Sequence, residues 1–295
     1  MWEHEVPAVG GRLWVLACAV VVACACASPT VAALAAEIAA TCLGLEPGPT
    51  RTVTRILDGE TMVLDDGTEL RLIGALAPRA IDADAEAGAW PPESAATEAL
   101  RTLVRGKSVA LGFAGERTDR YGRIQAHAFL VEGDARRWLQ GELTERGFAR
   151  AYAPSGNRVC SAELLALERA AREARRGLWA DAAYQVRPAD KPAELLRYRS
   201  TFQVVEGRIV RVSQTRDTIY LNFDRDWRRG FSASLRRDDS DLLGAYERNP
   251  KGLEGSTVRV RGWIGERGGM PVIDLSVGGL LEIASGSDTP PGQAR

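Results

Sequence analysis

The sequence predicts a mainly β protein of the α+β class, made of two successive small β-barrels, the first of which carries helices. Two observations support this prediction. In each half of the chain, five short runs of alternating or β-branched residues follow one another, and a helical or loop segment separates the third run from the fourth. The 295 residues are also enough for about two ordinary domains.

The first half of the chain combines strands with helices. Its predicted strands are residues 53–57, 61–64, 69–74, 108–113 and 124–130. Its predicted helices are residues 91–106, 136–146 and 161–175. The sequence Asp65-Asp66-Gly67 marks a hairpin turn, whereas prolines at the start and Gly106 at the end delimit the first helix. This order of elements is that of an OB-fold, a five-stranded Greek-key barrel that often binds oligonucleotides.

Arginines are concentrated in the last helix of this half. Its apolar face is formed by Leu164, Leu165, Leu167 and Ala171, and the other face mostly by Arg169, Arg172, Arg175 and Arg176. We therefore expect these arginines to face solvent.

The second half predicts a smaller OB-like β-barrel. Its predicted strands are residues 202–212, 218–223, 231–235, 257–264 and 272–275, with a helical or loop segment near 241–248. The stretch YLNFDRDWRRGF combines aromatic residues with arginines: Tyr220, Phe223, Trp227, Arg225, Arg228 and Arg229. These residues either form a surface for base stacking and phosphate binding, or the aromatic rings pack in the barrel while the arginines face solvent.

The composition also suggests where the domains begin and end. The expected segments are a signal peptide or membrane anchor at 1–35, a linker at 36–50, the first domain at 51–183, a linker at 184–200, the second domain at 201–284 and a disordered tail at 285–295.

The N-terminal segment predicts export. Residues 13–27 are apolar and uncharged, a length typical of a signal-peptide core and short of the roughly 20 residues that cross a membrane. A small-residue cleavage motif follows at Ala33-Leu34-Ala35. We expect a periplasmic or secreted protein. The alternative is a protein that stays associated with the membrane through residues 13–27 and faces outward.

The cysteines predict one disulfide bond. Cys18, Cys24 and Cys26 lie in the apolar segment, so cleavage would leave Cys42 and Cys160 as an even pair in an oxidising compartment. The alternative is two unpaired, buried thiols.

Histidine chemistry is disfavoured. The chain contains two histidines, His4 and His127, and His4 precedes the expected cleavage site. A histidine metal cluster or a Ser-His-Asp triad is therefore not expected.

Five motifs carry a specific resemblance. ILDGETMVL, LRLIGALAP, ERTDRYGR, WLQGELTERGFARAY and EARRGLW resemble, in order and spacing, the staphylococcal nuclease (thermonuclease) family over about residues 51–181. The resemblance implies an OB-fold barrel with helices, phosphodiester hydrolysis and a divalent cation, Ca²⁺ in this family. It also implies that nucleic acid, preferentially single-stranded, or a nucleotide is the binding partner.

The resemblance assigns roles to residues that bind phosphate and base. Arg71 and Arg123 match the two arginines that clamp the phosphate, a task suited to planar guanidinium groups. Arg120, Tyr121 and Tyr152 match positions beside the nucleotide. The alternatives are surface ion pairs for the arginines and packed rings for the tyrosines.

The metal and general-base positions depart from the family pattern. The turn Asp58-Gly59-Glu60-Thr61 retains two acids, so Asp58 and Glu60 are the expected metal ligands. The family's next loop carries an aspartate metal ligand and a glutamate proposed as base, but Leu76 and Arg79 stand there. Leucine offers no oxygen and arginine cannot accept a proton. Three acids further along, Asp82, Asp84 and Glu86, either substitute or form a solvated loop.

Three functional classes follow. The first is an exported thermonuclease-like phosphodiesterase with an altered, slow active centre. The second is a catalytically inactive module that binds nucleic acid or nucleotides, and the third is an envelope protein-interaction module. Since the formal net charge is only −1, any nucleic-acid surface must be a local patch.

Overall fold

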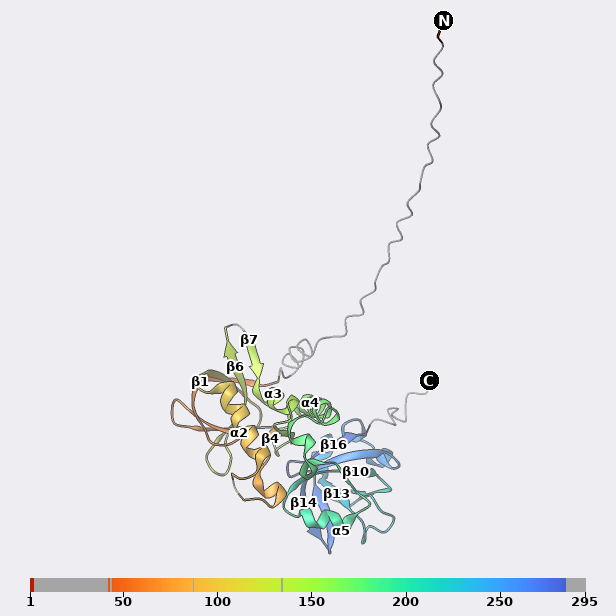
Figure 1. The fold of residues 1–295 in the computed structure, drawn as a ribbon. Helices are drawn as coiled ribbons and strands as arrows, with labels where there is room; N and C mark the ends of the chain where they lie inside the picture. Colours follow the sequence, from red (N-terminus) through yellow and green to blue (C-terminus); the bar gives the residue numbers. More distant parts are fainter. Residues whose placement is uncertain (3–41, 43, 87, 134, 285–295) are drawn as a thin grey trace.

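The computed structural model describes residues 1–2, 42, 44–86, 88–133 and 135–284 (Figure 1). The expected tail at 285–295 and residues 3–35 of the expected signal peptide or anchor, including the apolar segment and His4, lie outside the described residues. Within the described part of the chain, none of the helices has both the length and the apolar character needed to cross a membrane.

The strands of the first half close into a five-stranded barrel (Figure 1). They are β1 (Glu46–Ile56), β2 (Thr61–Leu64), β3 (Glu69–Leu72), β5 (Ser108–Phe113) and β6 (Ile124–Glu132). Pairing runs from β1 to β2, β3, β6, β5 and back to β1, and the β3–β6 pair is parallel. Because side chains alternate along a strand, residues such as Met62, Leu70 and Leu130 fill the interior. The predicted OB-fold barrel is confirmed.

Helices and short strands surround this barrel. The helices are α2 (Pro91–Val104), α3 (Leu139–Glu145) and α4 (Ser161–Glu173), and the short strands are β4 (Ala75–Leu76), β7 (Ala135–Trp138) and β8 (Arg150–Ala151). Helix α2 stands between β3 and β5 in the chain, as predicted, and buries Leu100 and Val104 against the barrel. Strands β4 and β8 and the loops around them lie outside the barrel and contact the second domain.

Two predicted boundaries in the first half are wrong. The expected linker at 36–50 ends before Glu46, because Glu46–Thr50 already pairs with β5. The register of this pairing shifts between Pro47 and Thr50. The shift accommodates the prolines of this stretch, which have no backbone N–H to donate to the neighbouring strand. The predicted helix at 136–146 begins only at Leu139, because Ala135–Trp138 pairs with β6 as a strand.

The second half forms a second barrel with the same order of pairing. Its strands are β10 (Phe202–Arg208), β11 (Arg211–Gln214), β12 (Thr218–Asn222), β13 (Ser232–Arg236), β14 (Thr257–Arg267), β15 (Met270–Asp274) and β16 (Leu280–Ile283). The predicted strand at 202–212 is bent into β10 and β11. Pairing then runs β11, β12, β13, β15, β14 and back to β10, with β16 added beside β14. The predicted helical segment is a 3₁₀ stretch, Arg237–Tyr246.

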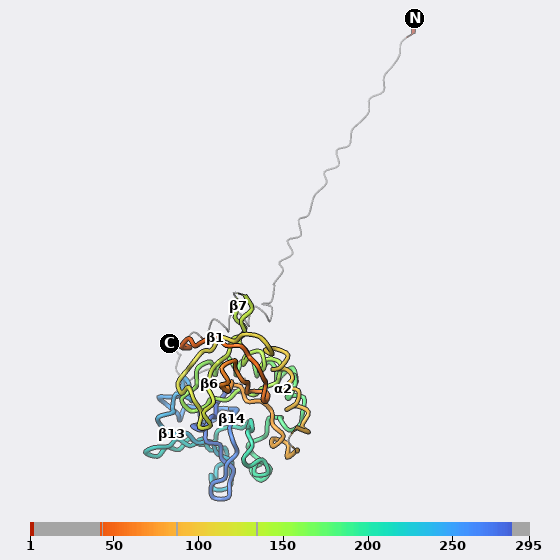
Figure 2. The backbone as a smooth tube through the Cα atoms, turned by 90° about the vertical axis from the view of Figure 1, so that its left-hand side faces the viewer, coloured from red at the N-terminus to blue at the C-terminus, as the bar shows by residue number. Residues whose placement is uncertain are grey.

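The segment expected as a linker at 184–200 is folded, so that expectation is wrong. Strand β9 (Arg187–Pro188) pairs with β10, and helix α5 (Pro192–Leu195) places Leu195 in the core of the second barrel. Tyr184 is also buried, and its hydroxyl contacts Asp82 of the first domain. Figures 1 and 2, two views at right angles, both show the barrels in direct contact.

A cluster of charged residues joins the two domains. Glu168 on α4 and Glu282 on β16 both contact Arg261 on β14, and Glu168 and Arg261 are 0% exposed. Arg169 and Arg172 of α4 also bind Glu282. The prediction that the arginines of this helix face solvent is therefore wrong for Arg172, whose side chain is 12% exposed, whereas Arg169 is partly exposed and Arg175 and Arg176 are exposed.

The predicted disulfide between Cys42 and Cys160 is present, with the two Cα atoms 5.4 Å apart. This separation lies within the usual range for a disulfide. The bond ties the residue preceding the first barrel to the start of α4, and both cysteines are buried.

His127 on β6 is a buried structural residue, and it leads to a prediction about pH. It is 1% exposed, its Nδ1 accepts a hydrogen bond from Trp138 Nε1 at 3.2 Å, and burial lowers its pKa to about 4. An unfolded histidine titrates near about 6.5. As the pH falls from about 6.5 to 4, the unfolded chain gains a proton that the native state excludes. Native stability is therefore lost across this window, by up to about 3 kcal/mol.

Urea unfolding at a series of pH values measures this loss. The variant His127→Gln lacks this titrating group, so its stability is expected to fall less steeply between about pH 6.5 and 5. Equal slopes for the two proteins would show that His127 is not the group responsible.

Candidate functional site

Glu60 and Arg71 form the base of the candidate site. The β2–β3 pairing sets Thr61 opposite Arg71, so Glu60, just before β2, lies beside Arg71. The Arg71 Nη2 to Glu60 Oε1 distance is 3.1 Å. The side chain of Glu60 is 2% exposed and that of Arg71 is 18% exposed. Glu60 is therefore buried, whereas part of the Arg71 side chain that binds it is exposed to solvent.

Arg79 contacts the same carboxylate. It follows β4 and places its Nη2 2.5 Å from Glu60 Oε1, while the backbone N–H of Ala77 donates to Glu60 Oε2 at 2.9 Å. The charge of Glu60 raises the pKa of Arg79, so this guanidinium remains protonated. Both oxygens of Glu60 are thus engaged by groups of the protein.

Arg123 lies just before the strand next to that of Arg71. It immediately precedes β6, whose parallel pairing with β3 sets Arg71 opposite Gln125. Its Nε donates to Asp119 Oδ2 at 2.8 Å within a tight turn. Burial raises the pKa of Asp119, but hydrogen bonds from Arg123 and Tyr121 bring it below its usual value. Of the two arginines that the resemblance predicts as a phosphate clamp, one therefore lies on β3 and the other at the start of the neighbouring strand.

Tyr121 presents an exposed aromatic ring at this edge. It is 68% exposed, and the guanidinium carbons of Arg120 and Arg123 lie 5.0 and 5.2 Å from its ring centroid. Both distances fall within cation–π range. The prediction that Arg120 and Tyr121 can meet a ligand agrees with this exposure.

Tyr152 does not lie on an open surface, so the expectation that it contacts a base is wrong for this arrangement. It is 3% exposed and packs against Phe202 and Trp263 of the second barrel. Burial raises its pKa to about 12. The second barrel occupies the side of the ring where a base would stack.

Leu76 belongs to the same contact between the domains. It lies in β4, is 4% exposed and forms an apolar cluster with Tyr152 and Phe202. A carboxylate at this position would be buried in that cluster opposite Arg150, which already binds Asp82, and burying a charge without a free partner is unfavourable by several kcal/mol. A leucine here therefore suits a domain that carries a second barrel at this place.

The residues present do not fit a calcium ion. Calcium takes six to eight oxygen ligands. Glu60 is engaged by Arg71, Arg79 and Ala77, and Leu76 supplies no oxygen. Asp58 accepts a hydrogen bond from the backbone N–H of Glu60 at 2.8 Å. In the described part of the chain, no group of three histidine, cysteine, aspartate or glutamate residues converges as a metal site would.

Asp82 is not free to replace the missing acids. Its Oδ2 accepts hydrogen bonds from Arg150 Nη2 at 2.6 Å and from the Tyr184 hydroxyl at 3.2 Å. Asp82 therefore stabilises the contact between the domains, and the expectation that it substitutes in catalysis is wrong. Asp84 and Glu86 are exposed.

The sequence did not predict the role of three residues at this edge: Arg150, Phe202 and Trp263. Arg150 is buried, and its Nη1 donates to the Phe202 carbonyl at 2.8 Å. No local pattern could have signalled these contacts, because each joins residues of different domains.

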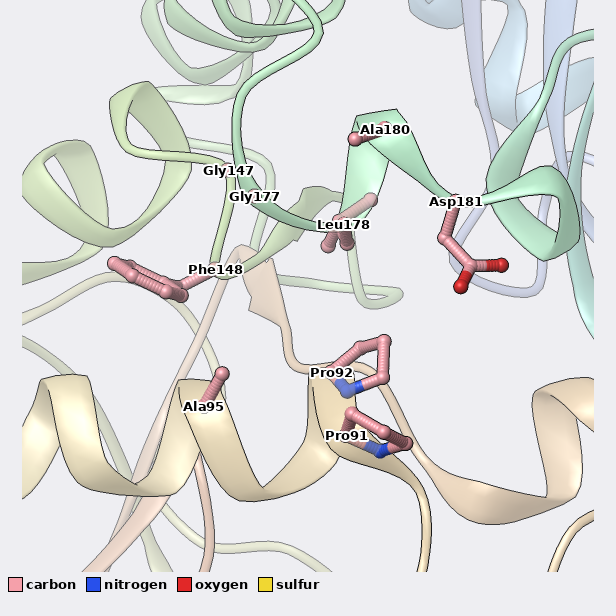
Figure 3. Close-up of a pocket in the computed structure, with 9 residues that line it drawn as sticks. All are labelled: Pro91, Pro92, Ala95, Gly147, Phe148, Gly177, Leu178, Ala180 and Asp181. Atoms are coloured by element: carbon pink, nitrogen blue, oxygen red, sulfur yellow. The ribbon is translucent and has the colours of Figure 1, made fainter.

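A separate hollow of about 360 Å³ lies at the start of α2 (Figure 3). Pro91 and Pro92 form one side of it and Phe148 and Leu178 the other. Its one charged lining residue, Asp181, accepts a hydrogen bond from the backbone N–H of Ala183 at 2.8 Å. Apart from this engaged carboxylate, the described residues that line the hollow offer no group for acid, base or phosphate chemistry.

Comparison with known proteins agrees with this architecture. The family model "staphylococcal nuclease homologue" matches residues 69–181. This range includes Arg71, Arg79 and Arg123, and begins after the turn that holds Asp58 and Glu60. The chain is also 29% identical to an uncharacterized endonuclease of Escherichia coli over 133 residues, which cover 44% of this chain and 76% of that protein.

The match to the family model, the endonuclease relative and the five-stranded barrel together support a nuclease-like function at the level of the family. The family is generally calcium-dependent, although the residues of this site do not fit that ion. Residues 46–181, which close the five-stranded barrel and contain the matched range 69–181, thus form a staphylococcal nuclease-like OB-fold domain within a longer chain.

Proposed function

We propose that the protein is an exported, nuclease-like phosphodiesterase that holds the backbone of nucleic acid and hydrolyses it slowly. The observation that carries this proposal is the parallel pairing of β3 with β6, which sets Arg71 beside the strand that Arg123 immediately precedes. Arg79 and Arg120 add two more guanidinium groups, against Glu60, Asp119 and the nearby Asp58 as the acids of the site. The balance of charge favours a phosphate, which guanidinium groups bind through paired hydrogen bonds.

Hydrolysis is slow in this proposal because no side chain is placed to activate water. Arg79, at the position that the family resemblance gives to the base, cannot accept a proton. Loss of a positioned general base typically costs about 10²- to 10⁴-fold in rate. Arg71 and Arg123 still stabilise charge that develops on the phosphate oxygens. The two arginines therefore still stabilise the transition state of hydrolysis, but the site lacks a side chain that accepts a proton from water.

Single-stranded nucleic acid is the proposed substrate. An unpaired strand exposes base faces that can stack on an aromatic ring while its phosphates meet arginines. Tyr121, exposed between Arg120 and Arg123, offers such a ring.

Export rests on residues 1–35 and on the Cys42–Cys160 disulfide, because disulfides persist in oxidising compartments. A periplasmic or secreted location is the main proposal. Retention at the membrane through residues 13–27 is the alternative.

A second candidate is a module that binds nucleic acid without cutting it. The ion pair between Arg79 and Glu60 favours this candidate, because it places a cation on the acid that survives in the turn. The two candidates share the same phosphate-binding residues and differ only in turnover.

The variants Arg71→Ala and Arg123→Ala are expected to weaken binding of a short, labelled single-stranded DNA by about 10- to 150-fold each. This range corresponds to hydrogen bonds made by a charged group. Fluorescence anisotropy measures the affinity, and Arg136→Ala is the control, since Arg136 is exposed on β7.

Cleavage is measured on the same DNA with calcium and with a chelator. Slow cleavage that both active-site variants abolish supports the hydrolase. Binding without cleavage above background supports the second candidate. Unchanged affinity in both variants would contradict the assignment of Arg71 and Arg123.

A further inference from the structure

The second barrel carries a polar outer face over its strands β11, β12, β13 and β15. Alternation along these strands sends Val212, Leu221 and Ala233 into the core. The neighbouring side chains project outward and gather at one place, because Tyr220 pairs with Ser213 and Asn222 pairs with Ser232. The register therefore assembles aromatic and hydrogen-bonding groups on one surface.

This face is hollowed into a cavity of about 680 Å³. Tyr220, Asn222 and Met270 line its floor. Trp227 and Arg228 line it from the loop between β12 and β13, and Arg267 lines it from the β14–β15 hairpin. The volume falls within the range of small-molecule sites and is ample for a nucleotide unit.

The side chains of this cavity combine exposed rings with cations. Trp227 is 58% exposed, and the Arg228 guanidinium carbon lies 4.6 Å from its ring centroid. The guanidinium carbon of Arg267 lies 5.6 Å from the ring centroid of Tyr220. None of the described residues that line the cavity is acidic. Two cations and no lining carboxylate favour an anionic ligand over a neutral one.

We propose that this cavity is a binding site for single-stranded nucleic acid on the second barrel. A base stacks on Trp227 or Tyr220, and the flanking phosphates contact Arg228 and Arg267. Stacking with arginine–phosphate contacts holds any base sequence, because each base has a flat face and each nucleotide has a phosphate. The second domain thereby holds the strand independently of the site around Arg71.

The test uses the full protein carrying Arg71→Ala and Arg123→Ala, so that the nuclease-like site does not contribute. Binding of a labelled single-stranded DNA of about 12 nucleotides is measured by anisotropy. Adding Trp227→Ala is expected to weaken the remaining binding by about 5- to 150-fold, the fold-change for loss of one stacked base. Because Trp227 is exposed, folding is not expected to depend on it.

Three further measurements make the test specific. Trp227→Phe is expected to recover most of the affinity, since a ring is restored. Arg267→Ala is expected to lower the slope of log affinity against log salt by about 0.7, the value for one phosphate contact with a single strand. Arg136→Ala, far along the chain on β7 of the other barrel, serves as the charge-matched control.

The proposal is overturned if Trp227→Ala leaves the remaining binding unchanged, or if Arg136→Ala reduces it as much as Arg267→Ala does. Trp227-dependent binding of a neutral oligosaccharide in place of DNA would also overturn it. Failure of the Arg71 and Arg123 variants to alter binding in the otherwise unchanged protein would contradict only the proposed site on the first barrel.

Discussion

Replacing Arg261 by methionine is expected to lower the free energy of unfolding by about 3–5 kcal/mol. Arg261 is 0% exposed, and its two terminal nitrogens contact Glu168 and Glu282. Glu168 is likewise 0% exposed and also accepts hydrogen bonds from Arg172 at 2.8 Å and from the backbone N–H of Ala151 at 2.7 Å. Removing the central cation leaves the fully buried Glu168 with Arg172 as its remaining contact among the described arginines, whereas Glu282 keeps three partly exposed ones, so the expected loss comes mainly from Glu168.

Urea denaturation measures this change, and Arg211→Met is the matched control. Arg211 is an exposed arginine on β11 of the same barrel, so its replacement is expected to change stability by less than about 0.5 kcal/mol. If Arg261→Met does not fold, the milder Arg172→Met, at a side chain 12% exposed, tests the same cluster. A stability change no larger than that of Arg211→Met, in whichever variant is measured, would contradict a stabilising role for the cluster.

This cluster illustrates which contacts of the fold could not be predicted from the sequence. The alternation of Thr218–Asn222 and the prolines at the start of α2 act locally, so they predicted those elements well. The arginines of α4 gave a local pattern that is also typical of a solvated face. Their partner, Glu282, is more than a hundred residues away in the chain, and only the tertiary fold brings it to them.

The candidate site shows the same division. Motif resemblance predicted Arg71 and Arg123 as a phosphate clamp, and the structure sets Arg71 on β3 and Arg123 just before the paired strand β6. It gave no warning that the second barrel covers Tyr152, since Phe202 and Trp263 lie outside the resembling segment. Leu76 looked like a simple loss of a ligand from the sequence. In the structure, it is also an apolar contact with Phe202, so the altered site and the added barrel are physically linked.

The covered face of Tyr152 bears on how a strand reaches the first barrel. A base cannot stack on a ring that Phe202 and Trp263 already contact. Tyr121 remains 68% exposed. We therefore expect ligand contacts to concentrate on Arg71, Arg123 and Tyr121, at the edge of the barrel where the β3 and β6 strands lie side by side.

Replacing Arg79 by glutamate is expected to raise the rate of DNA hydrolysis by about 10²-fold or more. The substitution removes one of the cations paired with Glu60 and places a proton acceptor where the family resemblance expects one. Because the Arg79 side chain is 49% exposed, a carboxylate there remains solvated and the fold is expected to tolerate it. The analogous change Leu76→Asp is less informative alone, since it buries a charge beside Phe202.

Arg79→Gln is the control that separates the two effects of this change. It removes the cation from Glu60 but supplies no base, so its rate is expected to stay near that of the unchanged protein. Initial rates on single-stranded DNA are compared for the three proteins, with calcium and with a chelator. If Arg79→Glu cuts no faster than Arg79→Gln, the missing acid does not limit hydrolysis. If Arg79→Glu alone is fast, the phosphate-binding half of the site is intact and a proton acceptor is what the protein lacks.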